Sequence, residues 1–250
     1  MESNRKNKVA VVTGSGRGVG FACAQALVGR GIHVVMVGRS PKVNSAAKRL
    51  LSKGFNCAPF QADCSTEEGS SAVTEFCQKN YGRVDFLINN AGVPGVGKIR
   101  DLTVEDWDYV LKNNLTSAFL CSRDLLPLLL KRRGGAIVNV ASVAARSYSL
   151  VAGVHYTASK AGMIGLTRQL AAETGPLGLR VNAVAPSQTK TEMLQKGLRR
   201  SGVSIRSLEE KNPMKTLASP KQVASVCVFL CTSEASYING AVLDVNGGMI

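Results

Sequence analysis

The sequence contains few aromatic residues and no long apolar run, and these two shortages exclude two kinds of partner. Aromatic residues make up 5% of the chain and are not interleaved with the basic residues, as they would be on a surface that binds nucleic acid. The most apolar stretch, residues 125–130, lies between Arg123 and Lys131 and falls well short of the ~20 residues that span a bilayer. We therefore expect neither a nucleic-acid partner nor a membrane partner.

Acidic residues are scarce as well. The 250 residues include 17 Asp and Glu against 31 Lys and Arg, which leaves a net charge of +14. The basic residues are dispersed apart from short clusters at 131–133 and 199–200, an arrangement that suits solubility or the attraction of an acidic ligand or carrier. The first eight residues lead into a strand-like run without the apolar core of a secretory signal, so we expect a cytoplasmic protein.

The seven cysteines show no pattern of a disulfide framework or a metal site. Their number is odd, and most of them lie in apolar segments scattered along the chain. Cys227 and Cys231 would share a helical face, but no His or further Cys lies nearby to complete a zinc site. We expect buried free thiols and no metal.

Segments typical of strands alternate with segments of helical spacing along the chain. Strands that are apolar throughout, joined by helices, indicate a parallel sheet covered on both faces. We predict an α/β fold: one Rossmann-type doubly wound domain over residues 1–250, with a seven-stranded parallel sheet flanked by helices on both faces. The predicted strands are 9–13, 33–37, 56–60, 84–89, 136–141, 180–185 and 242–245. The predicted helices include 18–30, 65–81, 103–133, 154–174 and 220–232.

One region, residues 190–214, breaks this alternation. It is long, polar and basic, which predicts a loop or short helices above a site. We therefore treat about 188–214 as a variable lid region of the same domain.

The ends of the predicted strands carry the most distinctive residues. In a doubly wound sheet the ligand binds beyond the carboxyl ends of the strands, where the strand order reverses. Six predicted strands are followed there by Gly14–Gly20, Gly38–Arg39, Asp63, Asn89–Gly92, Ser142 and Pro186. Their convergence predicts a binding site at this edge of the sheet.

The turn after the first predicted strand has three spaced glycines, Gly14, Gly18 and Gly20, preceded by Thr13. Glycines at these positions allow a tight turn, a close approach to phosphate and close packing of a helix on a strand. The amino end of the following helix would then face a pyrophosphate. This pattern predicts a dinucleotide site, although a glycine pattern alone can mark only a tight turn.

The end of the second predicted strand indicates which dinucleotide binds. A carboxylate there would pair with the ribose hydroxyls of NAD, but Gly38 is followed by Arg39 and Ser40. Arg39, with Arg17 from the glycine turn, would suit a 2′-phosphate because guanidinium groups bind phosphate in a bidentate way. We expect NADP(H) rather than NAD(H); the alternative is that both arginines are solvated surface residues.

Tyr156 and Lys160 are spaced so that they share one face of a helix. A phenol beside an ammonium group can donate or accept a proton near neutral pH, because a nearby cation lowers the pKa of the phenol. Together with the glycine turn, this pair predicts hydride transfer from a nicotinamide coupled to proton transfer by Tyr156. His155 is expected to form part of the pocket wall instead, since adjacent helical positions face different directions.

These motifs occur together in one known family. From about Lys8 to the carboxyl end, the chain resembles the short-chain dehydrogenase/reductase family, and in general pattern it is most similar to 3-oxoacyl-[acyl-carrier-protein] reductases. The resemblance is carried by the glycine turn 13–20, the Asn-Asn-Ala-Gly run 89–92, Ser142, the Tyr-x-x-x-Lys motif, the run 180–186, and, for the reductases, the runs 131–133 and 235–248.

The resemblance implies roles for individual residues. Tyr156 would be the general acid in reduction, Lys160 would support it and hold the nicotinamide ribose, and Ser142 would bind the substrate carbonyl. Asn114 would position a water in the proton relay, with the neighbouring Asn113 as the alternative. The cofactor-binding residues implied are Gly14, Ser15, Arg17, Gly18, Val19, Gly20, Arg39, Ser40, Asp63, Cys64, Asn90, Ala91, Gly92, Tyr156, Lys160, Pro186, Thr189 and Thr191.

The substrate is left open by the sequence. We predict NADPH-dependent reduction of a carbonyl to a hydroxyl, on a small-molecule or carrier-bound substrate such as a 3-oxoacyl thioester, a polyketide or another ketone. The alternatives are an NAD(P)-dependent alcohol dehydrogenase that oxidises a sugar or alicyclic alcohol, and a catalytically silent dinucleotide-binding regulator. By analogy with the family, we expect a homotetramer or homodimer.

Overall fold

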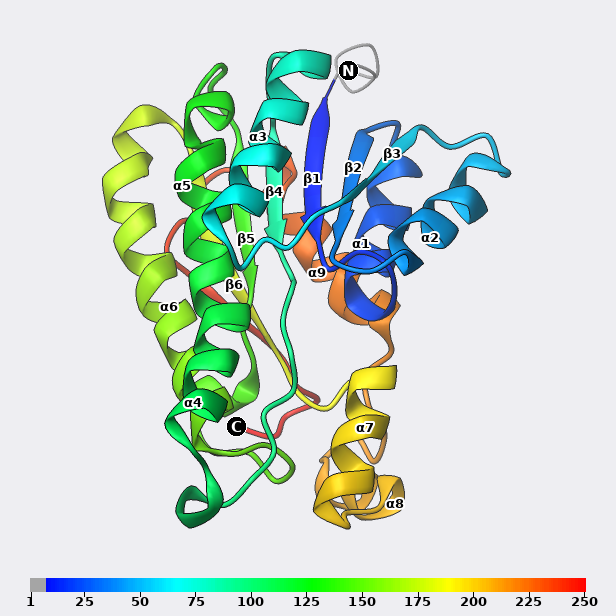
Figure 1. Ribbon diagram of the computed structural model, residues 1–250, viewed down its shortest axis with the longest axis vertical. Coiled ribbons are helices and arrows are strands. Elements are labelled where there is room, and N and C mark those ends of the chain that lie inside the picture. Colours follow the sequence, from blue (N-terminus) through cyan, green and yellow to red (C-terminus); the bar gives the residue numbers. More distant parts are fainter. Residues whose placement is uncertain (1–7) are drawn as a thin grey trace.

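The computed structural model describes residues 8–250, which form a parallel sheet of seven strands in the order β3-β2-β1-β4-β5-β6-β7 (Figure 1). All neighbouring strands pair in parallel. The strands are β1 (Val9–Thr13), β2 (His33–Gly38), β3 (Cys57–Gln61), β4 (Phe86–Asn89), β5 (Ala136–Val140), β6 (Arg180–Pro186) and β7 (Val242–Val245). The order reverses between β1 and β4, which places the expected ligand site beside these two strands.

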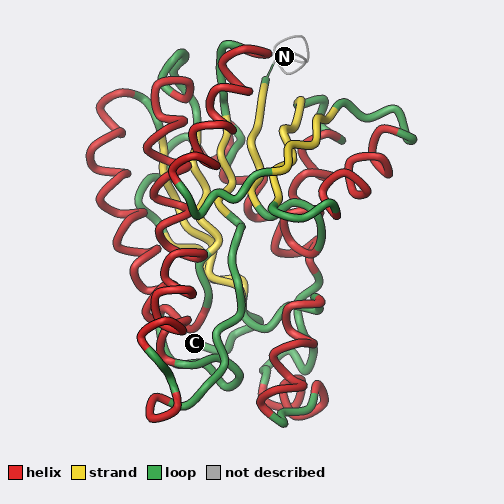
Figure 2. The backbone as a smooth tube through the Cα atoms, in the orientation of Figure 1, coloured by secondary structure: helices red, strands yellow, loops and turns green. Residues whose placement is uncertain are grey.

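Both faces of the sheet are buried, as the near-continuous apolar strands predict. Along β1, Ala10 and Val12 face one apolar core, whereas Val9 and Val11 face the other, because successive side chains of a strand point to opposite faces. The first core is covered by α1 (Gly18–Val28), α2 (Lys42–Leu51) and α9 (Pro220–Leu230), and the second by α3 (Glu67–Tyr81), α5 (Ser117–Leu129) and α6 (Val154–Thr174). Figure 2 shows the strands enclosed between these helices. The predicted fold class is confirmed.

Local capping explains where several helices begin. The Thr66 hydroxyl accepts a hydrogen bond from the Gly69 N–H at the start of α3, and Gly82 ends that helix in the left-handed conformation. Ser219 and Gln222 form a reciprocal capping box at the start of α9. The cap of α3 lies in the short connection after β3, and that of α9 follows the lid region.

The predicted helix 103–133 is interrupted, which corrects the expectation of one continuous element. It consists of α4 (Val104–Leu111), a π-helical turn η2 (Lys112–Thr116) and α5, which ends at Leu129. The π turn is stabilised by packing against α6 rather than by sequence propensity, so spacing alone does not reveal it. The pattern analysis also did not single out α2.

The lid region contains two short helices, α7 (Glu192–Ser201) and α8 (Ile205–Lys211), which Figure 1 shows beyond the carboxyl end of the sheet. This confirms the expectation of short helices. Single 3₁₀ turns complete the structure at η1 (Ile99–Asp101), η3 (Val143–Ala145), η4 (Gly175–Leu177) and η5 (Ser233–Ala235).

All seven cysteines are buried free thiols, as predicted. Among residues 8–250, the structure contains no group of His, Cys, Asp and Glu side chains that could hold a metal ion. Within the same range, no helix is both long and apolar enough to cross a membrane. The first seven residues, on which the expectation of no secretory signal depends, lie outside the described part of the chain.

Candidate active site

A cavity of about 550 Å³ opens at the carboxyl edge of the sheet, next to the β1–β4 reversal. Its walls come from the segments after β1 to β6 and from α7, so the lid region takes part in the site. The predicted residues that line it are Gly14, Arg17, Gly18, Val19, Arg39, Ser40, Asp63, Cys64, Asn90, Ala91, Gly92, Ser142, Tyr156, Lys160, Pro186, Thr189 and Thr191. The residues that follow the predicted strands therefore do meet in one cavity, as predicted.

The glycine turn lies against the end of β4. Gly14 has a φ of +64°, and a Cβ there would lie 2.9 Å from the Ala91 Cα, so a larger residue would separate the two segments. The Asn90 side chain donates hydrogen bonds to the Thr13 and Gly14 carbonyls at 3.0 and 3.2 Å. The turn, the close approach and the exposed amino end of α1 fit the pyrophosphate of a dinucleotide.

Two predicted cofactor-binding residues do not reach the cavity. Ser15 is fully buried, and both its N–H and its hydroxyl donate to the Val37 carbonyl, at 3.0 and 3.2 Å. Gly20 packs against the turn, since a Cβ there would lie 2.5 Å from the Gly14 carbonyl oxygen. These residues shape the turn rather than line the site.

The two predicted arginines line the cavity, but each already has partners. Arg17 Nη1 lies 2.5 Å from Glu192 Oε2 at the start of α7. Arg39 Nη1 lies 3.4 Å from Asp63 Oδ2 and donates to the Asn113 side-chain oxygen at 3.1 Å. Both side chains are also about half exposed, 46% for Arg17 and 52% for Arg39, so they lie at the surface of the cavity with partners from distant segments.

Asp63 is held mainly by its own loop. Its Oδ1 accepts hydrogen bonds from the Ser65 N–H at 3.0 Å and from the Ser65 hydroxyl at 2.7 Å, which form a local turn before α3. Oδ2 faces Arg39. The carboxylate therefore fixes the wall of the cavity beside β3.

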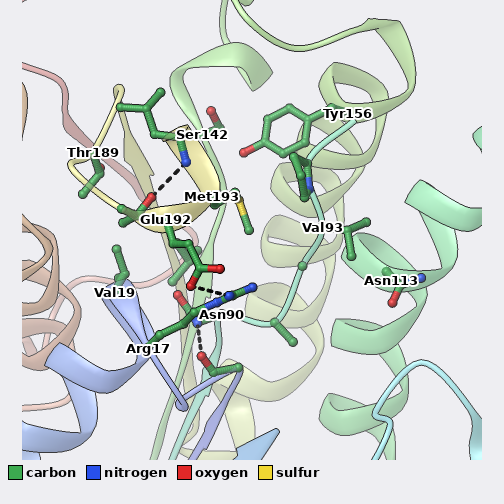
Figure 3. Close-up of a pocket in the computed structure, with 18 of the residues that line it drawn as sticks. Arg17, Val19, Asn90, Val93, Asn113, Ser142, Tyr156, Thr189, Glu192 and Met193 are labelled. Atoms are coloured by element: carbon green, nitrogen blue, oxygen red, sulfur yellow. Dashed lines mark hydrogen bonds and ion pairs between the residues drawn. The ribbon is translucent and has the colours of Figure 1, made fainter. Parts of the chain in front are cut away.

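Tyr156, Ser142 and Lys160 come together at the far end of the cavity. Figure 3 shows Tyr156 and Ser142 near Met193 of the lid, with Arg17 and Glu192 pointing toward each other. Lys160 is buried, and its Nζ donates to the Val140 carbonyl at 2.7 Å and lies 5.8 Å from the centre of the Tyr156 ring. Helical spacing and the end of β5 thus place three polar groups in one pocket.

Burial shifts both ionisable groups of this set. It raises the pKa of Tyr156, and contact with the Ser142 side chain offsets this only in part. Burial lowers the pKa of Lys160 to about 8. The expectation that a neighbouring cation lowers the phenol pKa stays a prediction for the site with its coenzyme bound, because the positively charged nicotinamide would then add to Lys160.

The π turn gives the two adjacent asparagines different surroundings. Asn114 is fully buried; its amide accepts from the Val93 N–H at 2.7 Å and donates to the Ser159 hydroxyl at 3.1 Å. Ser159 in turn donates to the Tyr156 carbonyl at 2.7 Å. Asn113 instead faces Arg39 and lines the cavity. Asn114 thus lies behind the wall on the Tyr156 side and connects the loop after β4 to α6.

His155 does not form part of the cavity wall, which corrects the prediction for this residue. It is buried, and its ring packs against Gly95 and Gly153, where an added Cβ would lie 2.8 and 2.9 Å from ring atoms. Burial lowers its pKa. Its role is to pack the loop after β4 against the start of α6.

Several lining residues were missed by the sequence analysis. They are Lys42, Val93, Pro94, Val96, Glu192 and Met193 among others. For Glu192 a signal was available, because it follows Thr191, whose hydroxyl caps α7 by accepting from the Leu194 N–H. The apolar residues carry no such signal, since only the packing shows which of them face the cavity.

Comparison with known proteins identifies relatives over the full length of the chain. The family model described as enoyl-(acyl carrier protein) reductase matches residues 14–250. The 3-oxoacyl-[acyl-carrier-protein] reductase FabG of Aquifex aeolicus (strain VF5) is 36% identical over 254 residues, which cover 100% of both chains.

Solved structures agree with this similarity. A 3-oxoacyl-[acyl-carrier protein] reductase from Brucella melitensis with bound NAD has a TM-score of 0.86 and 32% identity, covering 100% of this chain and 95% of that one. A structure from Beutenbergia cavernae, described as an NAD(P) dependent gluconate 5-dehydrogenase with bound NADP at low occupancy, has a TM-score of 0.90 and 33% identity, covering 97% and 96%.

Proposed function

Since the chain belongs to the short-chain dehydrogenase/reductase family of oxidoreductases, we propose that it reduces a carbonyl group to a hydroxyl with NADPH. The observation that carries this proposal is the convergence of Ser142, Tyr156 and Lys160 in the cavity that the glycine turn also lines. Residues 1–250 would act as one catalytic and dinucleotide-binding domain.

The roles proposed for these residues follow from their chemistry. NADPH, when bound, supplies the hydride. Tyr156 keeps its proton at neutral pH because burial raises its pKa, so it can donate that proton to the carbonyl oxygen. Ser142 donates a hydrogen bond to the same oxygen as negative charge develops there. Lys160 orients the coenzyme ribose, and Asn114 positions the wall beside Tyr156 through Val93 and Ser159.

The solved relatives do not choose between the two coenzymes, because one has NAD bound and another has NADP bound. The preference for NADP(H) is supported instead by residues of this chain. No acid follows β2; Gly38, Arg39 and Ser40 stand there and line the cavity. Arg17 and Lys42 lie on the neighbouring walls. This part of the site is suited to a 2′-phosphate.

The substrate proposed is a ketone, with a 3-oxoacyl thioester, free or carrier-bound, as the first candidate. The reductase relative of Aquifex aeolicus supports it, and so does the net charge of +14, which would attract an acidic carrier. The cavity that Tyr156 lines also has apolar walls, which include Val93, Val151 and Met193. The alternative, oxidation of a sugar or alicyclic alcohol, is supported by the relative described as a gluconate dehydrogenase.

The location and assembly are also proposals. Seven buried thiols without a disulfide favour a reducing compartment such as the cytoplasm. Exposed apolar side chains on α4 and α5, among them Trp107 and Phe119, favour a homodimer or homotetramer.

The test of the reaction is the Tyr156→Phe variant, assayed by NADPH absorbance with a panel of ketones that includes a 3-oxoacyl thioester. Loss of the hydroxyl removes the proton donor, so we expect kcat to fall by about a factor of 10²–10⁴, with NADPH binding retained. The matched control is Tyr237→Phe, at a fully exposed position. Equal rates for Tyr156→Phe and the wild type would disprove the role of Tyr156.

A further inference from the structure

The carboxylate of Glu192 faces three of the cations that line the cavity, Arg17, Lys42 and Lys196. Glu192 Oε2 lies 2.5 Å from Arg17 Nη1 and 3.6 Å from Lys42 Nζ, and Oε1 lies 3.4 Å from Lys196 Nζ. Arg17 precedes α1, Lys42 begins α2, and Glu192 begins α7. A single acid from the lid region thus connects the two turns that would surround an adenosine phosphate.

The position of Glu192 is defined by the lid helix. Thr191 caps α7, so Glu192 occupies the first helical residue, and the pair with Lys196 is an i,i+4 contact within the same helix. The contacts with Arg17 and Lys42, in contrast, join α7 to the segments after β1 and β2; Figure 3 shows the pair of Arg17 and Glu192. The hydrogen bond from Arg17 lowers the pKa of Glu192, which keeps the carboxylate charged at neutral pH.

A bound phosphate could replace Glu192 as the partner of Arg17 and Lys42. The side chains of Arg17 and Glu192 are 46% and 41% exposed, and pairs with such exposure contribute little to stability. A phosphate dianion and a carboxylate both bind a guanidinium through charge-assisted, often bidentate hydrogen bonds, so they can compete for Arg17. If the 2′-phosphate of NADPH binds at Arg17 and Lys42, it must displace Glu192 or bind beside its negative charge.

We propose that Glu192 modulates the coenzyme preference: its carboxylate competes with the 2′-phosphate of NADPH for Arg17 and Lys42 and so lowers the affinity for NADPH. This inference rests on the proposed coenzyme site. NADH lacks the phosphate, so its binding does not require these cations to leave Glu192. The carboxylate therefore weakens NADPH binding relative to NADH binding, and α7 approaches the glycine turn most closely when no 2′-phosphate is bound.

The test is to measure coenzyme binding for Glu192→Gln by fluorescence titration at low and high salt, without a ketone. At low salt we expect NADPH to bind about three- to tenfold more tightly, with NADH unchanged within about twofold. The gain should shrink at high salt because ions screen exposed charges. The fragments 2′,5′-ADP and 5′-AMP should show the same difference, because they differ only in the 2′-phosphate.

Three variants make this test specific. Glu209→Gln removes the same charge from the lid region at a residue that pairs with Lys190 at 3.1 Å, and it should leave the ratio of the NADPH and NADH dissociation constants unchanged. Glu192→Asp should keep the wild-type ratio. In an Arg17→Ala background, Glu192→Gln should no longer improve NADPH binding, because the contested cation is absent.

Two results would overturn the proposal: an equal change of both dissociation constants in Glu192→Gln, or weaker NADPH binding. The second would mean that Glu192 holds the lid over the bound coenzyme. Different results would refute the proposed function. Tighter NADH than NADPH binding in the wild type would refute the coenzyme preference, and absence of ketone reduction would refute the reaction, whereas the comparison of variants would still report on Glu192.

Discussion

Burial acts in opposite directions on two groups one helical turn apart in α6. It raises the pKa of the Tyr156 phenol and lowers that of the Lys160 ammonium to about 8, because a desolvated site favours the neutral form of each. Tyr156 therefore keeps its proton in the neutral range, as a proton donor requires. Lys160 is charged below pH 8 and loses its charge above it.

The pH dependence of reduction should reflect Lys160. We expect kcat to be constant in the neutral range and to fall as the pH rises through about 8, because deprotonation removes the cation next to Tyr156. Stopped-flow rates at saturating NADPH would measure this. The Lys160→Arg variant keeps its charge to higher pH, so its rate should not fall at that pH. A wild-type rate that stays constant far above pH 8 would contradict the assignment.

At the scale of elements, the start of α3 depends on one close contact. A Cβ on Gly69 would lie 1.9 Å from the Asp63 carbonyl oxygen, and the Gly69 N–H donates to the capping Thr66 hydroxyl at 3.1 Å. The helix can approach the loop after β3 only because this residue has no side chain. Asp63 and Cys64 of that loop line the cavity, so the contact also defines this wall of the cavity, where we propose that the adenosine binds.

The Gly69→Ala substitution should therefore reduce stability. The added methyl group must push the loop or the helix away, and we expect a loss of about 1–3 kcal/mol in urea denaturation, together with weaker NADPH binding. Gly197→Ala in α7 is the matched control, since its Cβ would have no neighbour within 4 Å. We expect no loss there, because alanine favours a helix more than glycine does. Equal midpoints for both variants would refute the role of Gly69.

At the scale of the whole molecule, α4 and α5 leave large apolar side chains exposed. Val104, Trp107 and Phe119 are 70%, 37% and 44% exposed. Exposed apolar side chains of this size on two consecutive helices favour contact with another copy. This surface on α4 and α5 is the one we expect to be covered in the proposed homodimer or homotetramer.

Sedimentation velocity tests this expectation. The wild type should sediment as a dimer or tetramer, and Phe119→Glu should shift it to a smaller species, because an uncompensated charge opposes burial of the surface. Leu51→Glu, on α2 and 47% exposed, is the control and should not change the assembly. A wild-type monomer at working concentration would refute the assembly.

The sequence by itself determined the parts that depend on local pattern and chain order. Alternating strands and helices predicted the parallel sheet, because period and apolar content are local properties. The glycine turn and the spacing of Tyr156 and Lys160 predicted which elements carry the site, since the carboxyl ends of parallel strands meet at one edge. The predicted strands agree with the structure in order and, within a few residues, in bounds.

Only the tertiary structure decided which groups contact one another. Arg17 meets Glu192, and Arg39 meets Asp63 and Asn113, across long separations in the chain. The π turn, which no local propensity indicates, directs Asn113 and Asn114 to different sides. The pKa shifts also follow from burial. Contacts between distant segments and desolvation arise from packing, so no pattern of neighbouring residues could reveal them.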